Sequence, residues 1–411
     1  MGWNYKPVTR DGDVITIHSL QNADSVNYFI GCVYNGKRLG YRDFTIVFDD
    51  IHSSYPNAVV PIAGLIDFYR SIGLSFESSS WDKNLQPILD PYCPTTHQEA
   101  LDRPLSKIWK FHNSKEVSFI HTAIVNELRR SDSFAKGVLE GIEWTIYEIM
   151  DNVLNHSESS AGFIMAQLHK SSKHIAITIY DAGIGIFNSL KHSIHKPKRN
   201  ADALSICVMA GITRDKNVGQ GNGMHGLYSL VQEGGGSLTI TSGKDAYVLK
   251  DGHSDIIPCK HKYYQPLNNI LTTTVDFQLD YSQNISIDKV LTFNGVQFDF
   301  VDLYAENLEN DQGDLVFNVA ELSEGTGTRE AALRLKNEII NLMRSRGQNA
   351  IIDFNGVSVI TSSFVDELIA KLFIELGLFQ FNQRIKILNL SITQQQTLQK
   401  SIVQRIIDEY K

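Results

Sequence analysis

The stretch that decides the fold of this chain is Glu-Ile-Met-Asp-Asn-Val-Leu-Asn-His at residues 148–156. Apolar residues recur at helical spacing before and within it, which predicts an amphipathic helix. On that helix Glu148, Asn152 and His156 stand four residues apart and form one polar line. A carboxylate can serve as a general base, and a side-chain amide oxygen can hold a hydrated Mg²⁺ ion. Taken alone, this spacing is more often that of a solvated helix face.

A second motif follows the alternating strand pattern of residues 174–180. It reads Asp-Ala-Gly-Ile-Gly-Ile, so that Asp181 ends the strand and Gly183 and Gly185 follow it. A carboxylate in this place can accept the exocyclic amine of adenine, and glycines let a ligand approach the backbone. By itself the pattern is more typical of a tight turn than of a nucleotide pocket.

A third motif, Gly-Gln-Gly-Asn-Gly-Met-His-Gly-Leu at residues 219–227, leads into a predicted helix and then a strand at residues 237–242. Glycines at the N-terminus of a helix form a cradle for anions. The string also contains the GxGxxG pattern of dinucleotide-binding folds, which requires an apolar strand directly before the glycines. The polar residues 213–217 stand there instead, so the sequence argues against a dinucleotide-binding fold.

In this order the three motifs resemble the N box and the two glycine boxes of the GHKL (Bergerat) ATP-binding superfamily, over residues 134–280. That superfamily includes DNA gyrase, heat-shock chaperone ATPases, mismatch-repair clamps, histidine kinases and anti-sigma serine kinases. The resemblance implies an α+β two-layer sandwich that binds ATP and Mg²⁺. We expect this domain to occupy residues 113–283.

The resemblance also implies a role for each matching residue. Glu148 would be the catalytic base, Asn152 the Mg²⁺ ligand and Asp181 the adenine anchor. Gly183 and Gly185 would form the turn beneath the base. The phosphates would be faced by Gly221, Gly223 and Gly226. Thr273 would stand on the strand that closes the pocket. Residues 187–220 would be the ATP lid, whose basic side chains either meet phosphate or are ordinary surface charges: Lys191, Lys196, Lys198, Arg199, Arg214 and Lys216.

The reaction is less clearly indicated than ATP binding. His156 is more like the anti-sigma serine kinases than the sensor histidine kinases, but Gly219 and Gln220 stand where those kinases usually carry a basic residue. Two hypotheses follow: a serine-kinase-like centre, and an ATPase switch that controls domain or partner association without phosphorylating protein. A nucleotide-sensing scaffold is a third class, against which the intact Glu148 weighs.

The region from 284 to 411 alternates strand and helix patterns, as small α/β domains do. Residues 350–357 and 360–368 resemble the strand, loop and helix of a STAS domain, in which a GHKL kinase phosphorylates a serine at the start of the helix. Ser362 and Ser363 occupy that place, although Thr361 stands where an aspartate is usual. The alternative is that a serine caps the helix, a role worth about 1 kcal/mol.

The region from 1 to 112 shows a similar pattern, with strands at residues 14–17 and 44–48 and a helix at residues 59–72. It is either a diverged STAS-like docking domain or an unrelated α/β unit. The polar, proline-bearing residues 78–104 are predicted to be a loop or linker.

Composition fits a globular protein. Hydrophobic types make up 42% of the 411 residues, and the net charge of −8 does not favour nucleic acid or an anionic membrane as a partner. No transmembrane stretch or secretion signal is evident, and the four cysteines are scattered, so we expect a cytoplasmic protein. Expected partners are ATP, a STAS-domain or sigma-factor-type regulatory protein, and a second copy of the chain in a homodimer.

Overall fold

The computed structural model describes residues 6–79, 82–209, 211–212, 222–258, 272–293, 296–297 and 303–409. The chain forms two compact units. The first contains Met1–Ile124, Gly141–Tyr281 and Ile285–Phe298, and the second contains Val125–Glu140, Ser282–Asn284 and Asp299–Lys411. Two long helices, α4 (Ser114–Ser131) and α5 (Val138–His156), therefore each contribute to both units.

A four-stranded sheet begins the first unit, and its strands follow the order β1 to β4. The first two strands are antiparallel, whereas the second, third and fourth are parallel and are joined by helices. The elements are β1 (Val8–Asp11), β2 (Val14–Ile17), α1 (Asp24–Arg38), β3 (Asp43–Phe48), α2 (Pro56–Ser71) and β4 (Ser75–Ser78). The two strands and the helix predicted here are confirmed.

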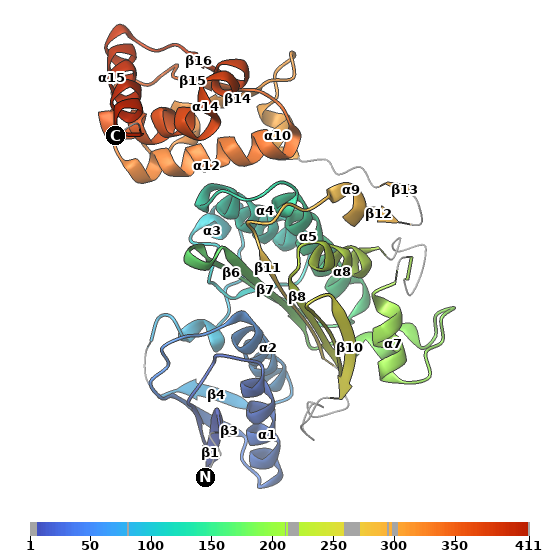
Figure 1. Ribbon diagram of the computed structural model, residues 1–411. Helices are drawn as coiled ribbons and strands as arrows, with labels where there is room; N and C mark the ends of the chain where they lie inside the picture. Colours follow the sequence, from blue (N-terminus) through green and yellow to red (C-terminus); the bar gives the residue numbers. More distant parts are fainter. Residues whose placement is uncertain are drawn as a thin grey trace. The chain divides into compact units, whose positions relative to one another are not determined.

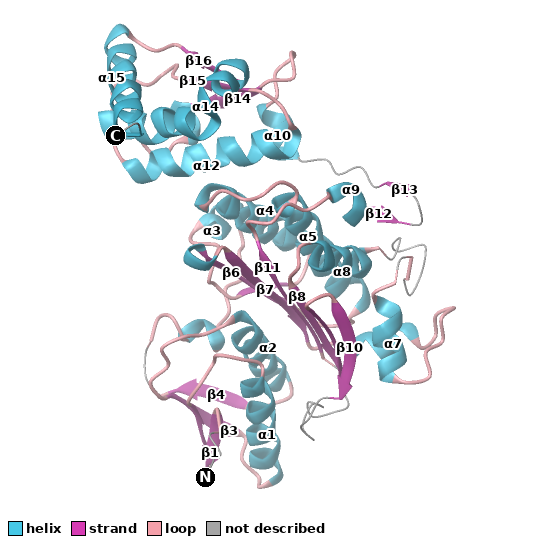
Figure 2. Cartoon of the chain, viewed as in Figure 1, coloured by secondary structure: helices cyan, strands magenta, loops and turns pink. Residues whose placement is uncertain are grey.

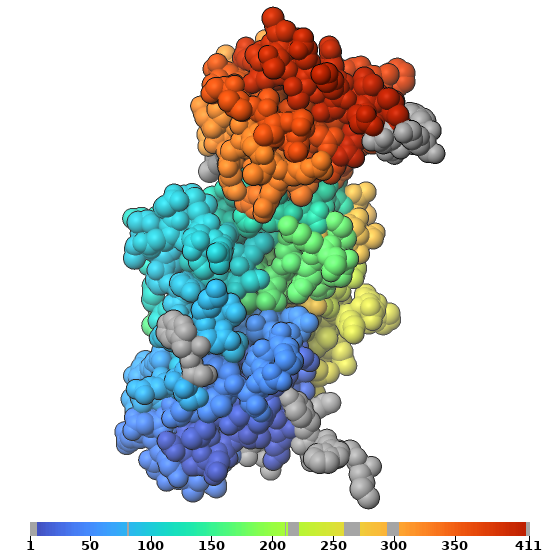
Figure 3. Space-filling model, turned by 90° about the vertical axis from the view of Figure 1, so that its left-hand side faces the viewer, coloured from blue at the N-terminus to red at the C-terminus, as the bar shows by residue number. Residues whose placement is uncertain are grey.

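The segment that follows β4 is not a simple linker. It contains η1 (Gln86–Ile88), α3 (His97–Leu101) and β5 (Trp109–Phe111). Leu85, Ile88 and Leu89 are buried in the same core as the N-terminal helices. On the face drawn in Figure 3, this segment lies against the N-terminal residues. Most of the described residues between 79 and 104 form the predicted loop around two short helices, and three buried apolar side chains fix this loop to the core, so it is not a free linker.

A seven-stranded sheet forms the centre of the first unit, in the order β10-β9-β8-β11-β7-β6-β5. Every neighbouring pair of these strands is antiparallel. This pattern agrees with the rejection of a dinucleotide-binding fold, whose sheet is mostly parallel. The remaining strands are β6 (Gly162–His169), β7 (His174–Asp181), β8 (Ser237–Ser242), β9 (Asp245–Lys250), β10 (His253–Pro258) and β11 (Thr273–Asp280).

Helices cover both faces of the large sheet (Figure 1). One face carries α5 and α8 (Gly223–Glu233), and α2 packs against β6 and β7 on the other. The contact of α2 is so close that a Cβ on Gly64 would lie 2.3 Å from the ring of Tyr180. Shorter elements complete the unit: η2 (Lys170–Ser172), α6 (Gly185–Leu190), α7 (Asn200–Cys207), α9 (Ile287–Val290), β12 (Thr292–Phe293) and β13 (Val296–Gln297).

The second unit is built on three parallel strands, β14 (Leu315–Asn318), β15 (Ala350–Asp353) and β16 (Ile385–Leu388). Figure 2 shows helices around this small sheet. They are α10 (Leu303–Leu308), α11 (Val319–Leu322), α12 (Arg329–Arg346), α13 (Ser362–Val365), the π-helical turn η3 (Asp366–Ala370), α14 (Lys371–Arg384) and α15 (Ile392–Glu409). The alternation of strands and helices predicted for this region is confirmed. The helical backbone of α14 is interrupted at Gly377 (φ +75°).

The molecule is thus a mixed α/β protein with several sheets. Among the described residues, no helix has both the length and the apolar character that a membrane crossing requires.

Candidate functional site

The candidate site is a cavity of about 370 Å³ in the first unit. Residues of α5, α6, α8, the end of β7 and the start of β11 line it. Six of the residues singled out from the sequence are among them: Glu148, Asn152, Asp181, Gly185, Gly223 and Thr273. His156, the third member of the polar line on α5, lines it as well. The polar line predicted on this helix therefore faces a cavity and not open solvent.

Glu148 is the acidic residue of this line, and its surroundings change its pKa strongly. Burial raises its pKa to about 7, and the nearby charge of Asp151 adds to the shift. The carboxyl therefore exchanges its proton near neutral pH, which is the property of an efficient general base.

The N-terminus of α8 lies directly beside Glu148 and Asn152. A Cβ placed on Gly223 would lie 2.9 Å from Oε2 of Glu148 and 3.0 Å from Nδ2 of Asn152. A side chain at this position would displace the ends of both side chains from where they lie. The first N–H groups of this helix, which have no partner within the helix itself, therefore lie close to a carboxylate and an amide, at the edge of the same cavity.

Asp181 closes another part of the cavity. It is the last residue of β7, it pairs with Thr273 of β11, and it is only 5% exposed. Its Oδ1 accepts the N–H of Gly183 at 2.9 Å. Burial raises the pKa of Asp181 to about 7, while the Gly183 N–H and the Thr273 hydroxyl act in the opposite direction. The site thus holds a buried hydrogen-bonding group at the place where the sequence predicts an adenine anchor.

The two glycines after Asp181 serve different purposes. At Gly183 a Cβ would lie 2.1 Å from the carbonyl oxygen of Ser157, so the backbone can pass there only without a side chain. The next residue, Ile184, donates its N–H to that same oxygen at 2.8 Å. Gly185 has φ +73°, a conformation that favours glycine, and it begins α6 at the cavity wall.

The glycines of the third motif are also unequal. Gly226 lies inside α8, where a Cβ would meet the ring of Trp144 at 2.0 Å, so this position allows α8 to pack on α5. It is not one of the described residues that line the cavity, whereas Gly223 is. Gly221 lies outside the described residues.

Several lining residues were not singled out from the sequence. Trp144 stands one turn before Glu148 on α5, so the same four-residue spacing could have found it. Its ring stacks on Phe293 with the ring centroids 5.6 Å apart. Phe293 follows the last strand of the large sheet, and no local pattern marks it as a site residue. Asp151 and Asn155 also line the cavity and are hydrogen-bonded to each other at 2.7 Å.

The predicted lid contains most of α6 and all of α7, and two of its described basic residues have local partners. Arg199 forms an ion pair with Asp202 at 2.8 Å, and Lys191 donates to Asn188 at 3.0 Å. Among the described residues that line the cavity, there is no lysine or arginine. Arg214 and Lys216 lie outside the described residues.

In the second unit the helix start at residue 362 is capped by a threonine. Oγ1 of Thr361 accepts the N–H of Phe364 at 3.1 Å, and Ser362 and Ser363 are the first residues of α13. The interpretation of either serine as the cap is therefore wrong, because the hydroxyl one position earlier already accepts the free N–H. Ser362 is exposed and Ser363 is half-buried.

Comparison with known families identifies one part of the chain. Residues 331–395, from α12 into the start of α15, match the STAS-like domain of unknown function (DUF4325). No curated protein matches the sequence. The matched segment contains β15, β16 and the helix that begins with Ser362. The C-terminal part of this chain is therefore a STAS-like domain.

Proposed function

We propose that residues 113–283 are a GHKL (Bergerat) ATP-binding domain, and that the protein is a Mg²⁺-dependent regulatory protein that acts on, or signals through, STAS-like domains. One observation carries the proposal. Six residues that match the motifs of that superfamily come from distant parts of the sequence and line one cavity. A solvated helix face or an ordinary tight turn would not require this convergence.

The residues present suit an adenine base. The carboxyl group of Asp181 is buried at the cavity wall and already accepts hydrogen bonds from the backbone N–H of Gly183 and from the side chain of Thr273. A carboxylate oxygen retains further lone pairs, one of which can accept the exocyclic amine of adenine. The apolar side chains of Ile186 and Val275 also line the cavity and could contact the flat ring.

The residues present also suit a triphosphate that is bound with Mg²⁺. The described lining contains acidic groups, amide groups and His156 but no lysine or arginine, so a bare triphosphate would meet carboxylates. A Mg²⁺ ion held through the Asn152 amide oxygen would neutralise phosphate charge, and the N-terminal N–H groups of α8 would add hydrogen bonds. Glu148 would take the proton of the water or hydroxyl that attacks the γ-phosphate.

Two acceptors for that phosphate are consistent with the fold. The first is a serine of a STAS-like domain, either Ser362 or Ser363 of this chain or a serine of a partner. The finding that Thr361 provides the cap supports it, because the exposed hydroxyl of Ser362 is not required for the cap. The second acceptor is water, in an ATPase switch. It is supported by α5, which carries Glu148 and also contributes its first residues to the second unit.

The test is incubation of the full chain with γ-labelled ATP and Mg²⁺, followed by measurement of labelled protein and of released phosphate. Glu148→Gln should lower either product by on the order of 10²- to 10⁴-fold, because the general base is lost while the shape is kept. The double variant Ser362→Ala and Ser363→Ala is compared with Ser358→Ala, an exposed serine of the loop before α13.

The outcomes separate the two hypotheses. Label that is lost in Glu148→Gln and in the double variant, but kept in Ser358→Ala, would establish a self-acting serine kinase. Released phosphate without labelled protein would establish the ATPase switch. If wild type gives neither product, or if Glu148→Gln is as active as wild type, the proposed centre is wrong.

A further inference from the structure

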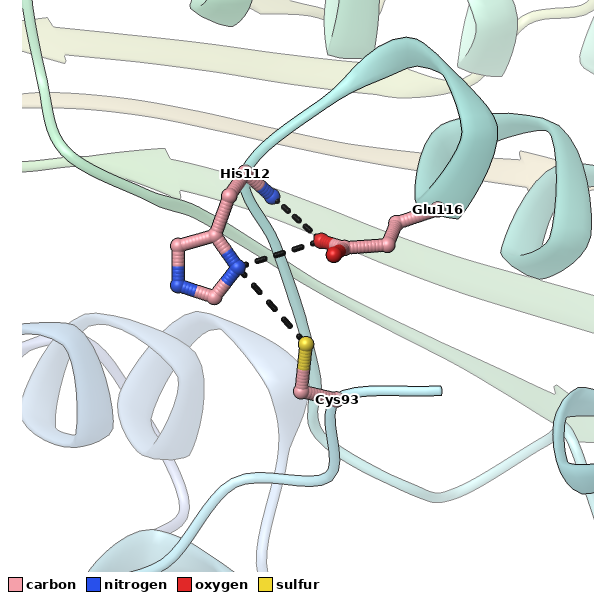
Figure 4. A group of neighbouring side chains, drawn as sticks. All are labelled: Cys93, His112 and Glu116. Carbon is pink, nitrogen blue, oxygen red and sulfur yellow. Dashed lines mark hydrogen bonds and ion pairs between the residues drawn. The ribbon is translucent and has the colours of Figure 1, made fainter. Parts of the chain in front are cut away.

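A second group of reactive side chains lies outside the cavity, where β5 is followed by α4. His112 comes directly after β5, and Glu116 is in the first turn of α4. Cys93 arrives from a separate segment, which runs beside β5 because Tyr92 is hydrogen-bonded to the backbone on both sides of Trp109. Figure 4 shows the three side chains directed toward one another.

The three groups converge on a single point. Sγ of Cys93 lies 3.6 Å from Nδ1 of His112, and the same nitrogen lies 3.1 Å from Oε2 of Glu116. All three potential ligand atoms lie within 4.8 Å of one another. His112 is exposed, so an ion from solution can reach the group.

These separations are close to the edges of a zinc coordination tetrahedron. With a Zn–S bond of about 2.3 Å and a Zn–N bond of about 2.05 Å, tetrahedral geometry places sulfur and nitrogen about 3.6 Å apart. Nitrogen and a carboxylate oxygen at about 2.0 Å would be about 3.3 Å apart in the same geometry. The distances from Nδ1 of His112 to Sγ of Cys93 and to Oε2 of Glu116 are therefore already within a few tenths of an ångström of those in a zinc site.

Two alternatives, a catalytic cysteine triad and a helix cap, explain this arrangement less fully than a metal site does. In such a triad, the thiol and the carboxylate contact opposite nitrogens of the imidazole ring, whereas here both lie beside Nδ1. A helix cap explains Glu116, which accepts the N–H of His112 at 2.7 Å and the amide of Asn113 at 2.8 Å. It does not explain why a cysteine from another segment points to the same atom.

The surrounding charges favour a cation. Burial is the largest cause of the raised pKa of the Cys93 thiol, and the nearby carboxylates of Glu116 and Glu99 raise it further. Lys110 acts in the opposite direction, but its amine forms an ion pair with Asp67 at 2.5 Å.

We propose that this chain binds one Zn²⁺ ion through Cys93 Sγ, His112 Nδ1 and a carboxylate oxygen of Glu116, with a fourth position open to water or to a ligand from another molecule. Thiolate, imidazole and carboxylate are the usual protein ligands of zinc. On binding, the thiol releases its proton to solvent, and Nδ1 coordinates while Nε2 carries the ring proton. The ion would then join the segment that contains Cys93 to the start of α4.

The full chain, stripped of metal with a chelator, tests the proposal. Cobalt(II) titration should give a thiolate-to-cobalt charge-transfer band that saturates at one equivalent and is displaced by Zn²⁺. Cys93→Ser and His112→Gln should each weaken Zn²⁺ binding by at least about tenfold, measured by competition with a chromophoric chelator. The matched controls Cys32→Ser and Cys259→Ser should bind as wild type does.

A second measurement uses wild type alone, so that a folding defect in a variant cannot decide the result. Zn²⁺ should slow alkylation of Cys93 by iodoacetamide, as mapped by mass spectrometry, and should leave the rate at Cys32 unchanged. The proposal is overturned if no saturable binding is found, if Cys259→Ser removes the signal while Cys93→Ser keeps it, or if Zn²⁺ does not protect Cys93.

Discussion

At the scale of single residues, Asp181 shows how a buried carboxyl group lowers the stability of the protein that carries it. Its carboxyl is buried at the end of β7, and that burial raises its pKa to about 7 from an ordinary value near 3.8. Between these two values the folded protein holds a proton that the unfolded chain has released. The stability that this proton contributes is complete below the ordinary value and is lost as pH rises through about 7.

Asp181→Asn should remove this pH dependence, because the amide keeps the shape and does not titrate. In nucleotide-free protein, the free energy of unfolding of wild type relative to the variant should fall by on the order of 3 kcal/mol between pH 4 and pH 8. Urea denaturation of both proteins across this range measures the difference. A difference that stays constant with pH would show that Asp181 is not a buried acid.

At the scale of elements, the packing of α8 on α5 sets the width of the cavity. Gly226 is the point of closest approach, since any side chain there would meet Trp144. Gly226→Ala should therefore destabilise the protein by roughly 1–3 kcal/mol through overpacking. The matched control is Gly327→Ala, at a glycine with nothing within 4 Å and without a positive φ, which should change the free energy of unfolding by less than about 0.5 kcal/mol.

Thermal unfolding of the two glycine variants is the measurement. A Gly226→Ala protein that melts together with the Gly327→Ala control would mean that Trp144 moves aside without cost, and that the two helices are less tightly packed than the structure shows.

Elements with a strong local signal could be predicted from the sequence, and those without one could not. The helix at residues 328–346 was predictable because Thr328 caps it and Gly347, with φ +70°, ends it. The polar line on α5 was predictable because helical spacing alone puts Glu148 and Asn152 on one side. The position of Phe293 at the cavity depends on how the segment after β11 folds back onto α5, and the spacing of residues in the sequence does not indicate that.

The same limit applies to Cys93 and His112. They lie 19 residues apart, and only the pairing of Tyr92 with β5 brings them together. The capping role of Thr361 also needed the structure, because a threonine and two serines in a row are all suitable caps by sequence.

At the scale of the whole molecule, the chain uses one topology twice. In β2-β3-β4 and in β14-β15-β16, three parallel strands lie in sequence order and helices join them. The first set carries an additional antiparallel strand, β1. The similar pattern of the two regions in sequence thus extends to strand order and direction. The STAS-like character of the N-terminal region stays a prediction.

The second unit also depends on residues far away in sequence. Asn341 of α12 accepts the N–H of Phe134 and donates to the carbonyl oxygens of Arg129 and Asp132, at 2.8–2.9 Å. Asn341→Ala leaves three backbone groups without this partner and should cost about 2–4 kcal/mol. Asn355→Ala, at an exposed turn, should be nearly neutral. The stability of the second unit in the two variants is compared by hydrogen exchange of the α12 amides. Equal protection of these amides in Asn341→Ala and Asn355→Ala would contradict the assigned role of Asn341.

The contact between α2 and the large sheet bears on how this protein can vary between organisms. Phe163 and Tyr180 on the sheet and Ala63 and Ile66 on α2 are at most 1% exposed, and they belong to one continuous core. Recombination that transferred the large sheet without the first 79 residues would leave an apolar face uncovered. We expect these two parts to be inherited together as a single cassette, and their boundary to be a poor place for a gene fusion.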